Sequence, residues 1–463
     1  MASYWFQPET VSLELGGRTL TLETGRMAKQ AAGAVVVTYG ETVVLVTAAR
    51  AKPREGIDFF PLVVDFVEKT SAAGKIPGGF FKRECSLSDR EILVCRFIDR
   101  SIRPLFPEGY RDETQIMATV LSAGDENTPE IPAFIGASAA LSISQIPFKG
   151  PIGAVRMGRV EDTLVVNPTR EQLELSDLDL IVGASRGALV MVEGSANEVP
   201  EAEILDALKQ AHSEIVRVID CQEELQGRVG KTKIETPEPV DRSELEARVR
   251  KQAEERLDVA VQIRVKDERS VAIAEIEKEV LAGFTSAYRD EPVSLDSLAA
   301  VENRREGLSQ LSGDVKSILH DLRSELVRRR ILRSGERIDG RGVADVRSIA
   351  SEVRVLPRPH GVALFTRGET QALVFTTLGG RFDTQTIDGL TERISKKFFL
   401  HYNFPPFSVG EARMLRGPSR RDVGHGNLAE RAIRPVLPSA EDFPYTLRVV
   451  SEVLESNGSS SMA

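Results

Sequence analysis

Cysteine is scarce in this 463-residue chain, which contains only Cys85, Cys95 and Cys221. Three scattered cysteines are too few for a disulfide framework, and without a CxxC pair they make no zinc site. No apolar run approaches the roughly 20 residues needed to span a bilayer, and the stretch from Met1 to Phe6 lacks the basic and apolar order of a signal peptide. We therefore expect a cytoplasmic protein that does not contact a membrane.

A net positive charge is also missing, because the formal charge at pH 7 is -9. This balance argues against a protein that binds nucleic acid through its overall charge, so any such binding must be local. Positive side chains do gather at a few places along the chain. They are Lys82-Arg83; Arg96, Arg100 and Arg103; Arg328-Arg329-Arg330; and Arg413, Arg416, Arg420, Arg421, Arg431 and Arg434.

An internal repeat is the strongest sign of how the chain is organised. Tyr39–Thr47 returns as Arg367–Thr376, with β-branched residues on both sides of a glycine, which predicts a hairpin in a sheet. Two further blocks return in the same order: Arg100–Pro107 as Arg431–Pro438, and Glu126-Asn127 as Ser456-Asn457. Matched blocks in register indicate a duplicated domain, and the composition, 41% hydrophobic, permits two or three domains.

The first copy continues past Asn127 with a predicted small-residue helix, four strands and a closing helix. These are Ile135–Leu141; Ile152–Met157, Leu164–Asn167, Leu180–Gly183 and Ala188–Glu193; and Ala202–Cys221. Residues for the same elements do not follow Ser456-Asn457, so the repeat predicts that roughly the second half of the second domain is absent. A unit of this kind would not bury its core alone.

The segment between the copies has a different composition. It has neither glycine nor proline from Val240 to Ala282, which predicts helices. One apolar stripe runs through Leu245, Val249, Ala253, Leu257 and Val261. A further helix is predicted over Asp314–Leu332, and Lys231–Pro239 is interpreted as the linker that precedes the segment. We expect a connector or lid rather than a catalytic module.

The chain ends on a small-residue turn, Ser456–Ala463. Such a turn at the start of a helix offers backbone N–H groups and serine hydroxyls to an anion such as orthophosphate. A frayed tail is the alternative interpretation. The duplication favours the first, because it places the turn in the middle of a domain.

Two groups of residues suit single-stranded nucleic acid. Gly78–Arg83 combines Phe80 and Phe81, which can stack on bases, with Lys82 and Arg83, which can pair with phosphates. The phenylalanines could instead be ordinary core residues beside a turn. Arg96, Arg100 and Arg103 follow at positions i, i+4 and i+7, so they share one face of a helix. A solvated face on which Asp99 and Glu91 pair with the arginines is the alternative.

A further basic cluster lies in the second copy. Arg420 and Arg421 can form bidentate contacts with phosphate, and His425 lies between glycines that leave it open to a ligand. We interpret the other four histidines as structural or exposed. No carboxylates are convincingly clustered near the serine turn to hold a metal ion. Asp177 and Asp179 of the first copy are interpreted as a solvated edge.

These motifs together resemble those of the bacterial polynucleotide phosphorylase family. The resemblance covers essentially the whole chain, and the motifs that carry it are Gly78–Arg83, Arg100–Pro107, Gly417–Gly426 and Ser456–Ala463. It implies an α/β fold with two RNase PH-like domains in tandem and an all-α domain between them, the second copy incomplete. The corresponding boundaries are 1–230, 240–332 and 333–463.

The resemblance also implies a function and a set of roles. The activity would be processive 3′-to-5′ phosphorolysis of RNA to nucleoside diphosphates, with orthophosphate as co-substrate and synthesis as the reverse reaction. Ser459, Ser460 and Ser461 would bind phosphate, with Arg420, Arg421 and His425 as catalytic partners. The RNA-binding residues would be Phe80, Phe81, Lys82, Arg83, Arg96, Arg100 and Arg103.

The partners implied are single-stranded RNA, two further copies in a homotrimeric ring, and an RNA-degrading multienzyme assembly. Mg²⁺ or Mn²⁺ would be the cofactor, but the aspartates and the lysine that follow the serine turn in the family have no counterpart here, nor do the KH and OB-fold modules. Without a metal ion the charge on the transferring phosphoryl group is poorly neutralised. We therefore expect this polypeptide alone to have little phosphorolytic activity.

Two alternatives from other functional classes stay open. A non-catalytic RNA-binding ring subunit would use the basic clusters without any dependence on phosphate. A small-molecule kinase could use Gly458–Ser461 as a serine loop, although it would explain neither the duplication nor the arginine rows.

Overall fold

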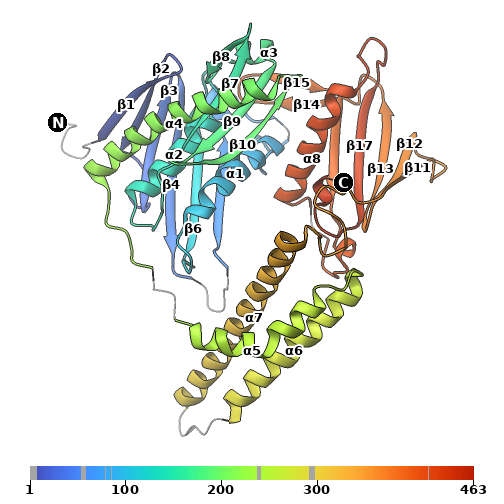
Figure 1. Cartoon of the computed structure of the whole chain (residues 1–463). Coiled ribbons are helices and arrows are strands. Elements are labelled where there is room, and N and C mark those ends of the chain that lie inside the picture. The colour runs from blue at the N-terminus through green and yellow to red at the C-terminus, as the bar shows by residue number, and fades with distance from the viewer. Residues whose placement is uncertain are drawn as a thin grey trace. The chain divides into compact units, whose positions relative to one another are not determined.

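The computed structural model describes residues 8–53, 59–78, 80–84, 86–236, 241–290, 298–415 and 417–462. Some features noted in the sequence lie outside these ranges: the first seven residues, Gly79, Cys85, Pro237, Pro239, Arg416 and Ala463. The chain divides into two compact units, one made of 1–237 with 349–463 and the other of 238–348. The first unit contains both copies of the repeat (Figure 1).

The first copy is built on a six-stranded sheet in the order β1-β2-β3-β4-β6-β5. Its strands are β1 (Glu9–Leu15), β2 (Arg18–Thr24), β3 (Gly33–Tyr39), β4 (Thr42–Ala51), β5 (Leu62–Glu68) and β6 (Glu113–Ser122). Neighbours are antiparallel except β5 and β6, which run parallel. Alternate residues of β3 and β4 are buried, as a sheet covered on one face requires.

Helices cover the buried face of this sheet, and a smaller sheet follows. The helices that cover it are α1 (Asp89–Ile102), α2 (Glu130–Ile143) and α4 (Glu201–Val229), and the short α3 (Arg170–Leu175) lies against the smaller sheet. The smaller sheet has the order β10-β9-β7-β8, from β7 (Gly153–Val160), β8 (Thr163–Val166), β9 (Leu178–Ala184) and β10 (Leu189–Ala196). Every residue of α2 is buried, since it lies between β3, β4 and α4 (Figure 1). The predicted elements are confirmed, with α2 and α4 longer than expected.

The second copy repeats five of the six strands of the first sheet, with no counterpart of β1 among the described residues. Its order is β11-β12-β13-β17-β16, again with only the last pair parallel. The strands and helix are β11 (Ile349–Val353), β12 (Gly361–Arg367), β13 (Thr370–Gly379), β16 (Phe398–Asn403), β17 (Thr446–Glu455) and α8 (Arg420–Ile433), with an added hairpin of β14 (Gln385–Asp388) and β15 (Arg393–Lys396). The predicted duplication is therefore confirmed in the order of its strands.

Local details of the two copies agree as well. Helix α1 begins with a capping box between Ser88 and Glu91, and α8 begins with one between Ser419 and Asp422. The turns before β4 and β13 place Gly40 and Gly368 at the same φ of 58°. Within 349–462, nothing described corresponds to α2, α4 or the strands β7–β10. The second copy accordingly has a smaller core, centred on β16 and β17.

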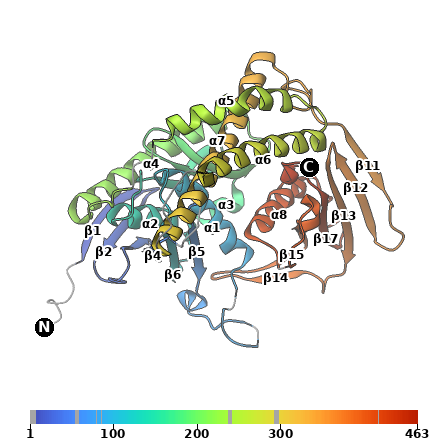
Figure 2. The same cartoon turned by 90° about the horizontal axis from the view of Figure 1, so that it is seen from below.

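The second unit consists of three helices, α5 (Ser243–Ala260), α6 (Lys266–Asp290) and α7 (Leu298–Ser334) (Figure 2). Val249, Ala253 and Leu257 of the predicted stripe are buried in its core. Ile318, Leu322 and Leu326 of α7 are buried in the same core. Helix α7 begins earlier in the chain than the predicted helix. The helical composition of this segment was therefore a sound predictor of its fold.

The close approach of α2 to β3 gives a test of this packing. A Cβ at Gly33 would lie 2.1 Å from the carbonyl oxygen of Ala140, so Gly33→Ala must push α2 off the sheet. We expect the free energy of unfolding to fall by about 1–3 kcal/mol in urea denaturation. Gly227→Ala is the matched control, because nothing lies near that exposed helical position and alanine should raise stability by up to about 1 kcal/mol. Equal effects of the two changes would contradict the packing.

Candidate active site in the second copy

The serine turn lies against the end of β12. Gly458 and Ser459 have positive φ angles of 76° and 53°, which reverse the chain after β17. Arg367 donates hydrogen bonds to the carbonyl oxygens of Ser459 (3.0 Å) and Met462 (3.3 Å). The turn is therefore held by its backbone, and its three serine hydroxyls are left to other partners.

Ser460 is the buried serine of the three. Its hydroxyl accepts a hydrogen bond from the Tyr402 hydroxyl at 3.0 Å, and only 8% of the residue is exposed. Burial raises the pKa of Tyr402, so the phenol keeps its proton and stays a donor. The Tyr402 bond thus fixes Ser460, whereas Ser459 is exposed and Ser461 half-buried.

Helix α8 places Arg421 and His425 one turn apart, so both lie on the same face. The ring of His425 meets the ring of Tyr402 edge-on, with centroids 5.0 Å apart. Its Nδ1 is buried and has no hydrogen-bond partner. An unsatisfied buried nitrogen costs free energy unless a ligand supplies the missing bond, so His425 is ready to contact one.

The pKa of His425 lies below its ordinary value of 6.5. Burial is the main cause, followed by the positive charges of Arg421 and Arg96, and Asp422 offsets only part of the effect. The imidazole is therefore neutral at pH 7 and can both donate and accept a hydrogen bond.

These residues border a common cavity of about 1220 Å³. Its walls include Arg421, His425, Ser459 and Ser460, together with Ser419 at the N-terminus of α8. Two of the three predicted phosphate-binding serines and two of the three predicted catalytic residues are thus brought together. Ser461 is next to this wall in sequence, and its role stays a prediction.

Arg420, the third predicted catalytic residue, faces elsewhere. Its guanidinium donates to the carbonyl oxygen of Val64 and pairs with Asp65 at 2.6 Å, both on β5 of the first copy. Of the two arginines, Arg421 borders the cavity and Arg420 contacts the first copy. The predicted catalytic role of Arg420 stays a prediction.

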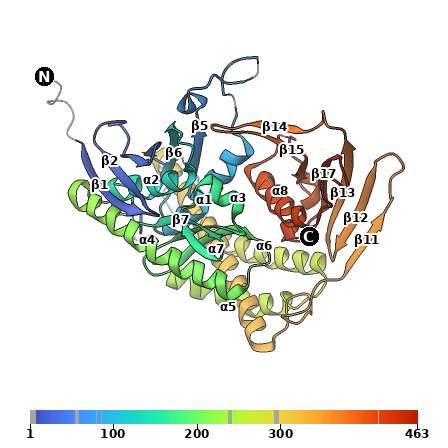
Figure 3. The same ribbon diagram turned by 90° about the horizontal axis from the view of Figure 1, so that it is seen from above.

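Arg96 lies near His425, although it is not one of the residues that border the cavity. Helices α1 and α8 lie side by side (Figures 1 and 3), and a Cβ at Gly424 would be 2.4 Å from Arg96 Nε. The missing side chain of Gly424 therefore gives Arg96 room beside His425. A positive charge from the first copy is thus added to the site of the second.

The other predicted RNA-binding residues separate into two sets. Phe80 and Phe81 are 92% and 80% exposed, and Lys82 and Arg83 are exposed beside them, so the alternative of ordinary core residues is wrong. Arg100 is exposed at the end of α1.

Arg103 is already engaged within the first copy. It pairs with Asp99 at 2.6 Å and donates to the carbonyl oxygens of Phe60 and Leu62, each at 3.1 Å. The alternative of a paired helix face is correct for this residue. Arg100 and Arg103 nevertheless stay exposed, and the role of the three arginines in RNA binding stays a prediction.

Acidic residues near the cavity do not form a metal site. Asp422 completes the capping box of α8, Glu452 accepts a hydrogen bond from Asn403, and Glu411 lies 3.7 Å from Arg413. Among the described residues, no group of three or more histidine, cysteine or acidic side chains is arranged to hold a metal ion. The donors present do not fit a divalent cation, and we assign no step to one.

Two contributors to this site were missed in the sequence. Tyr402 and Arg367 hold the serine turn through Ser460 and Ser459. Arg367 opens the repeated block that returns from Tyr39, so the repeat itself was an available signal. For Tyr402 no comparable motif existed, since it is one of several aromatic residues on a strand.

Family comparisons agree with this division of the chain. A family model described as 3′ exoribonuclease family, domain 1 matches residues 16–147 and 345–463, which are the two copies of the sheet. The chain belongs to the 3′ exoribonuclease family. Domain 2 of the same family matches residues 150–214, and the RNA-binding domain of polyribonucleotide nucleotidyltransferase matches residues 244–342.

Curated relatives give the same assignment. The polyribonucleotide nucleotidyltransferase of Geotalea uraniireducens is 52% identical over 454 residues, 98% of this chain and 62% of that protein. The enzymes named likewise from Thermomicrobium roseum and Sorangium cellulosum are 52% and 51% identical, with 56% and 58% of their lengths covered. The chain thus spans less than two thirds of these relatives. In the part that the structure describes, no helix is both long and apolar enough to cross a bilayer.

The charge around His425 gives a pH prediction. Arg421→Ala removes a neighbouring positive charge, so we expect the pKa of His425 to rise, whereas Arg421→Lys keeps the charge and should leave it low. NMR titration of ¹³C-labelled histidine measures the pKa of His425 in both variants. The resonance of His425 is assigned by its absence from the spectrum of His425→Gln or His425→Glu. An unchanged pKa of His425 in Arg421→Ala would contradict the conclusion that the charge of Arg421 lowers it.

The same titration affects stability with a definite sign. The unfolded chain takes up a proton near pH 6.5, but folded His425 does so only at lower pH. The stability that this group contributes is therefore complete above pH 6.5 and is lost as the pH falls through the folded-state pKa.

Proposed function

We propose that the cavity of the second copy binds orthophosphate and the 3′ end of single-stranded RNA, for processive phosphorolysis to nucleoside diphosphates that is reversible as polymerisation. The observation that carries the proposal is the convergence of the serine turn, Arg421 and a neutral His425 with an unpaired nitrogen on one cavity. Family membership and the relatives named polyribonucleotide nucleotidyltransferase support the same reaction.

The chemistry divides among these residues as follows. Phosphate lies between the Ser459 and Ser460 hydroxyls and the Arg421 guanidinium, which binds two of its oxygens. One phosphate oxygen attacks the terminal phosphodiester, a new P–O bond forms, and the bond to the preceding 3′ oxygen breaks. The 3′ oxygen leaves with the proton that the attacking hydrogen phosphate gives up, and His425 hydrogen bonds to the phosphate through Nδ1. Arg96 adds positive charge where two anions must approach each other.

Several features of the intact protein belong to the same proposal. They are a homotrimeric ring in the cytoplasm, association with an RNA-degrading multienzyme assembly, use of Mg²⁺ or Mn²⁺, and the domain boundaries 1–230, 240–332 and 333–463. The metal ion would neutralise charge on the transferring phosphoryl group. Because the described residues supply only the anion side of the site, we expect slow phosphorolysis by this polypeptide alone.

The two alternatives are distinguished by their dependence on phosphate. Membership of the 3′ exoribonuclease family removes the basis for a small-molecule kinase. A non-catalytic RNA-binding subunit would bind RNA equally well with and without phosphate and would not respond to changes in the cavity.

Phosphate binding tests the proposal directly. Arg421→Ala should weaken the binding of inorganic phosphate by about 10- to 100-fold in isothermal titration calorimetry, because it removes a charge-assisted pair of hydrogen bonds. Release of nucleoside diphosphates from a labelled oligoribonucleotide with phosphate and Mg²⁺ should fall with it. Arg358→Ala, an exposed arginine of the same copy away from the cavity, is the control. If both variants bind phosphate like the wild type, the cavity is not the site.

RNA contact by the aromatic pair is tested separately. Replacing Phe80 and Phe81 by alanine should weaken binding of single-stranded RNA by about 10-fold or more at fixed salt, since each stacked base contributes roughly 1–3 kcal/mol. Phe382→Ala removes an equally exposed phenylalanine, 86% exposed, as control. Fluorescence anisotropy with a labelled oligonucleotide measures both. Equal losses would show that exposed aromatic surface, rather than this pair, accounts for the effect.

A further inference from the structure

The two copies can be compared position by position at their helices. Arg90 and Arg421 are each the second residue of the helix after a capping box, and Val94 and His425 are each the sixth. The first copy therefore keeps the arginine of the candidate phosphate site and loses the histidine.

The loop after β6 in the first copy and the loop after β17 in the second also contain equivalent positions. Thr42 donates to the carbonyl oxygen of Asn127 at 3.2 Å, and Thr370 accepts from the backbone N–H of Asn457 at the same distance. Three residues beyond each asparagine, α2 begins at Glu130 and the last turn begins at Ser460. Glu130 thus takes the place of the buried phosphate-site serine.

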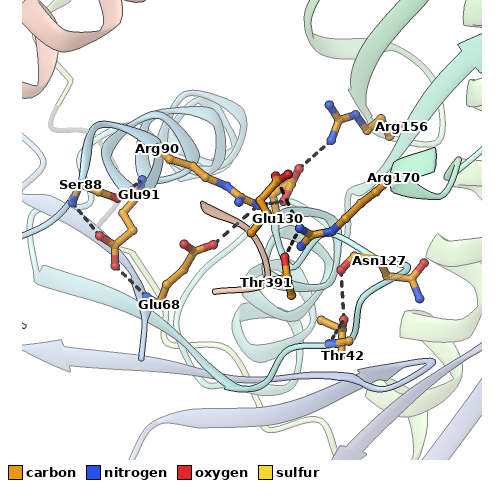
Figure 4. A network of polar contacts seen from close by, with 12 residues as sticks. Thr42, Glu68, Ser88, Arg90, Glu91, Asn127, Glu130, Arg156, Arg170 and Thr391 are labelled. Atoms are coloured by element: carbon orange, nitrogen blue, oxygen red, sulfur yellow. Dashed lines mark hydrogen bonds and ion pairs between the residues drawn. The ribbon is translucent and has the colours of Figure 1, made fainter. Parts of the chain in front are cut away.

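Glu130 has the surroundings of a bound anion. Its carboxylate lies 3.3 Å from Arg90 Nη2 and 2.9 Å from Arg156 Nη1, with only 6% of the residue exposed (Figure 4). Asp179, which was expected to be solvated, instead holds Arg156 through two hydrogen bonds of 2.7 Å. Burial alone would raise the pKa of Glu130, but Arg90 and Arg156 outweigh it and keep the carboxylate charged.

The turn between β14 and β15 closes this position. Leu390 is 5% exposed and lies in the core of the first copy. Thr391 accepts a hydrogen bond from Arg170, which lies beside Glu130 in Figure 4, and Lys75 donates to the Gly389 carbonyl oxygen at 3.1 Å. A segment of the second copy therefore covers the position in the first copy that corresponds to the open cavity.

We propose that the first copy contains a phosphate-type anion site that is occupied by the carboxylate of Glu130 and covered by the 389–392 turn. Arg90 keeps the position that Arg421 has in the second copy, and the anion is supplied by the chain itself. The site then serves as a socket that joins the two copies, instead of taking up a substrate. The comparison with Ser460 rests on the proposed phosphate site, and the test below separates the two.

Glu130→Ser places the second-copy residue in the first copy. In chloride buffer, the thermal midpoint should fall by roughly 2–4 °C or more, because Arg90 and Arg156 lose the anion they share and keep only Glu68 and Asp179 as acidic partners among the described residues. Exchanging chloride for inorganic phosphate at constant ionic strength should raise the midpoint of this variant by more than it raises that of the wild type. If Glu130→Ser is unfolded in chloride, recovery of its circular dichroism in phosphate is the equivalent result.

Three controls identify the source of the response. Glu130→Gln removes the charge but fills the space, so it should be destabilised without the added phosphate response. Glu91→Ser changes another buried glutamate of the same copy, 7% exposed, which caps α1 and should show no such response. Arg421→Ala combined with Glu130→Ser removes the contribution of the second copy.

The outcomes are distinct for the two proposals. A phosphate response in Glu130→Ser that survives Arg421→Ala supports the socket. A response equal to that of the wild type and Glu91→Ser, or no recovery of an unfolded variant, overturns it. Failure of Arg421→Ala to reduce the wild-type response would instead count against the phosphate site of the second copy.

Discussion

The packing of α1 on α8 is the contact on which the candidate site depends. Gly424 leaves the space that Arg96 fills, and a Cβ there would lie 2.4 Å from the Arg96 guanidinium nitrogen. Arg420 reinforces the contact by pairing with Asp65. Because α1 belongs to the first copy and α8 to the second, the charge around His425 comes from both. The charge around the candidate site is therefore a property of the joined copies, because the first copy adds Arg96 to a cavity whose walls belong to the second.

The two copies use the same helix position for two different purposes. Arg90 and Arg421 occupy equivalent helical positions, but one faces Glu130 in the protein interior and the other faces a cavity. A buried ion pair contributes little net stability, because desolvation offsets the attraction. Its value here is geometric: the carboxylate, its two arginines and the covering turn require one arrangement of the copies. Glutamate at position 130, where the second copy has Ser460, thus has two consequences. The first copy loses ligand binding, and the second copy is held in a fixed orientation.

Much of this organisation could be predicted from the sequence. The repeat predicted a duplicated domain, the absence of glycine and proline predicted the central helices, and the serine turn, Arg421 and His425, which were predicted to act together, border one cavity. The direction of Arg420 could not be predicted, because neighbouring arginines on a helix point about 100° apart and tertiary packing decides which faces a cavity. Tyr402 was missed because its contact with Ser460 joins positions far apart in the chain. Glu130 carries no local motif, and only alignment of the folded copies gives it meaning.

The charges of the candidate site are divided in a way that suits a reaction between anions. Arginine stays protonated throughout the physiological range, so Arg421 and Arg96 provide positive charge that does not vary with pH. Those charges, added to burial, lower the pKa of His425 and keep the imidazole neutral. A protonated imidazole would bind an anion more strongly but could only donate hydrogen bonds. The neutral ring can also accept a proton from bound phosphate, and this second capacity exists because two arginines already supply the attraction.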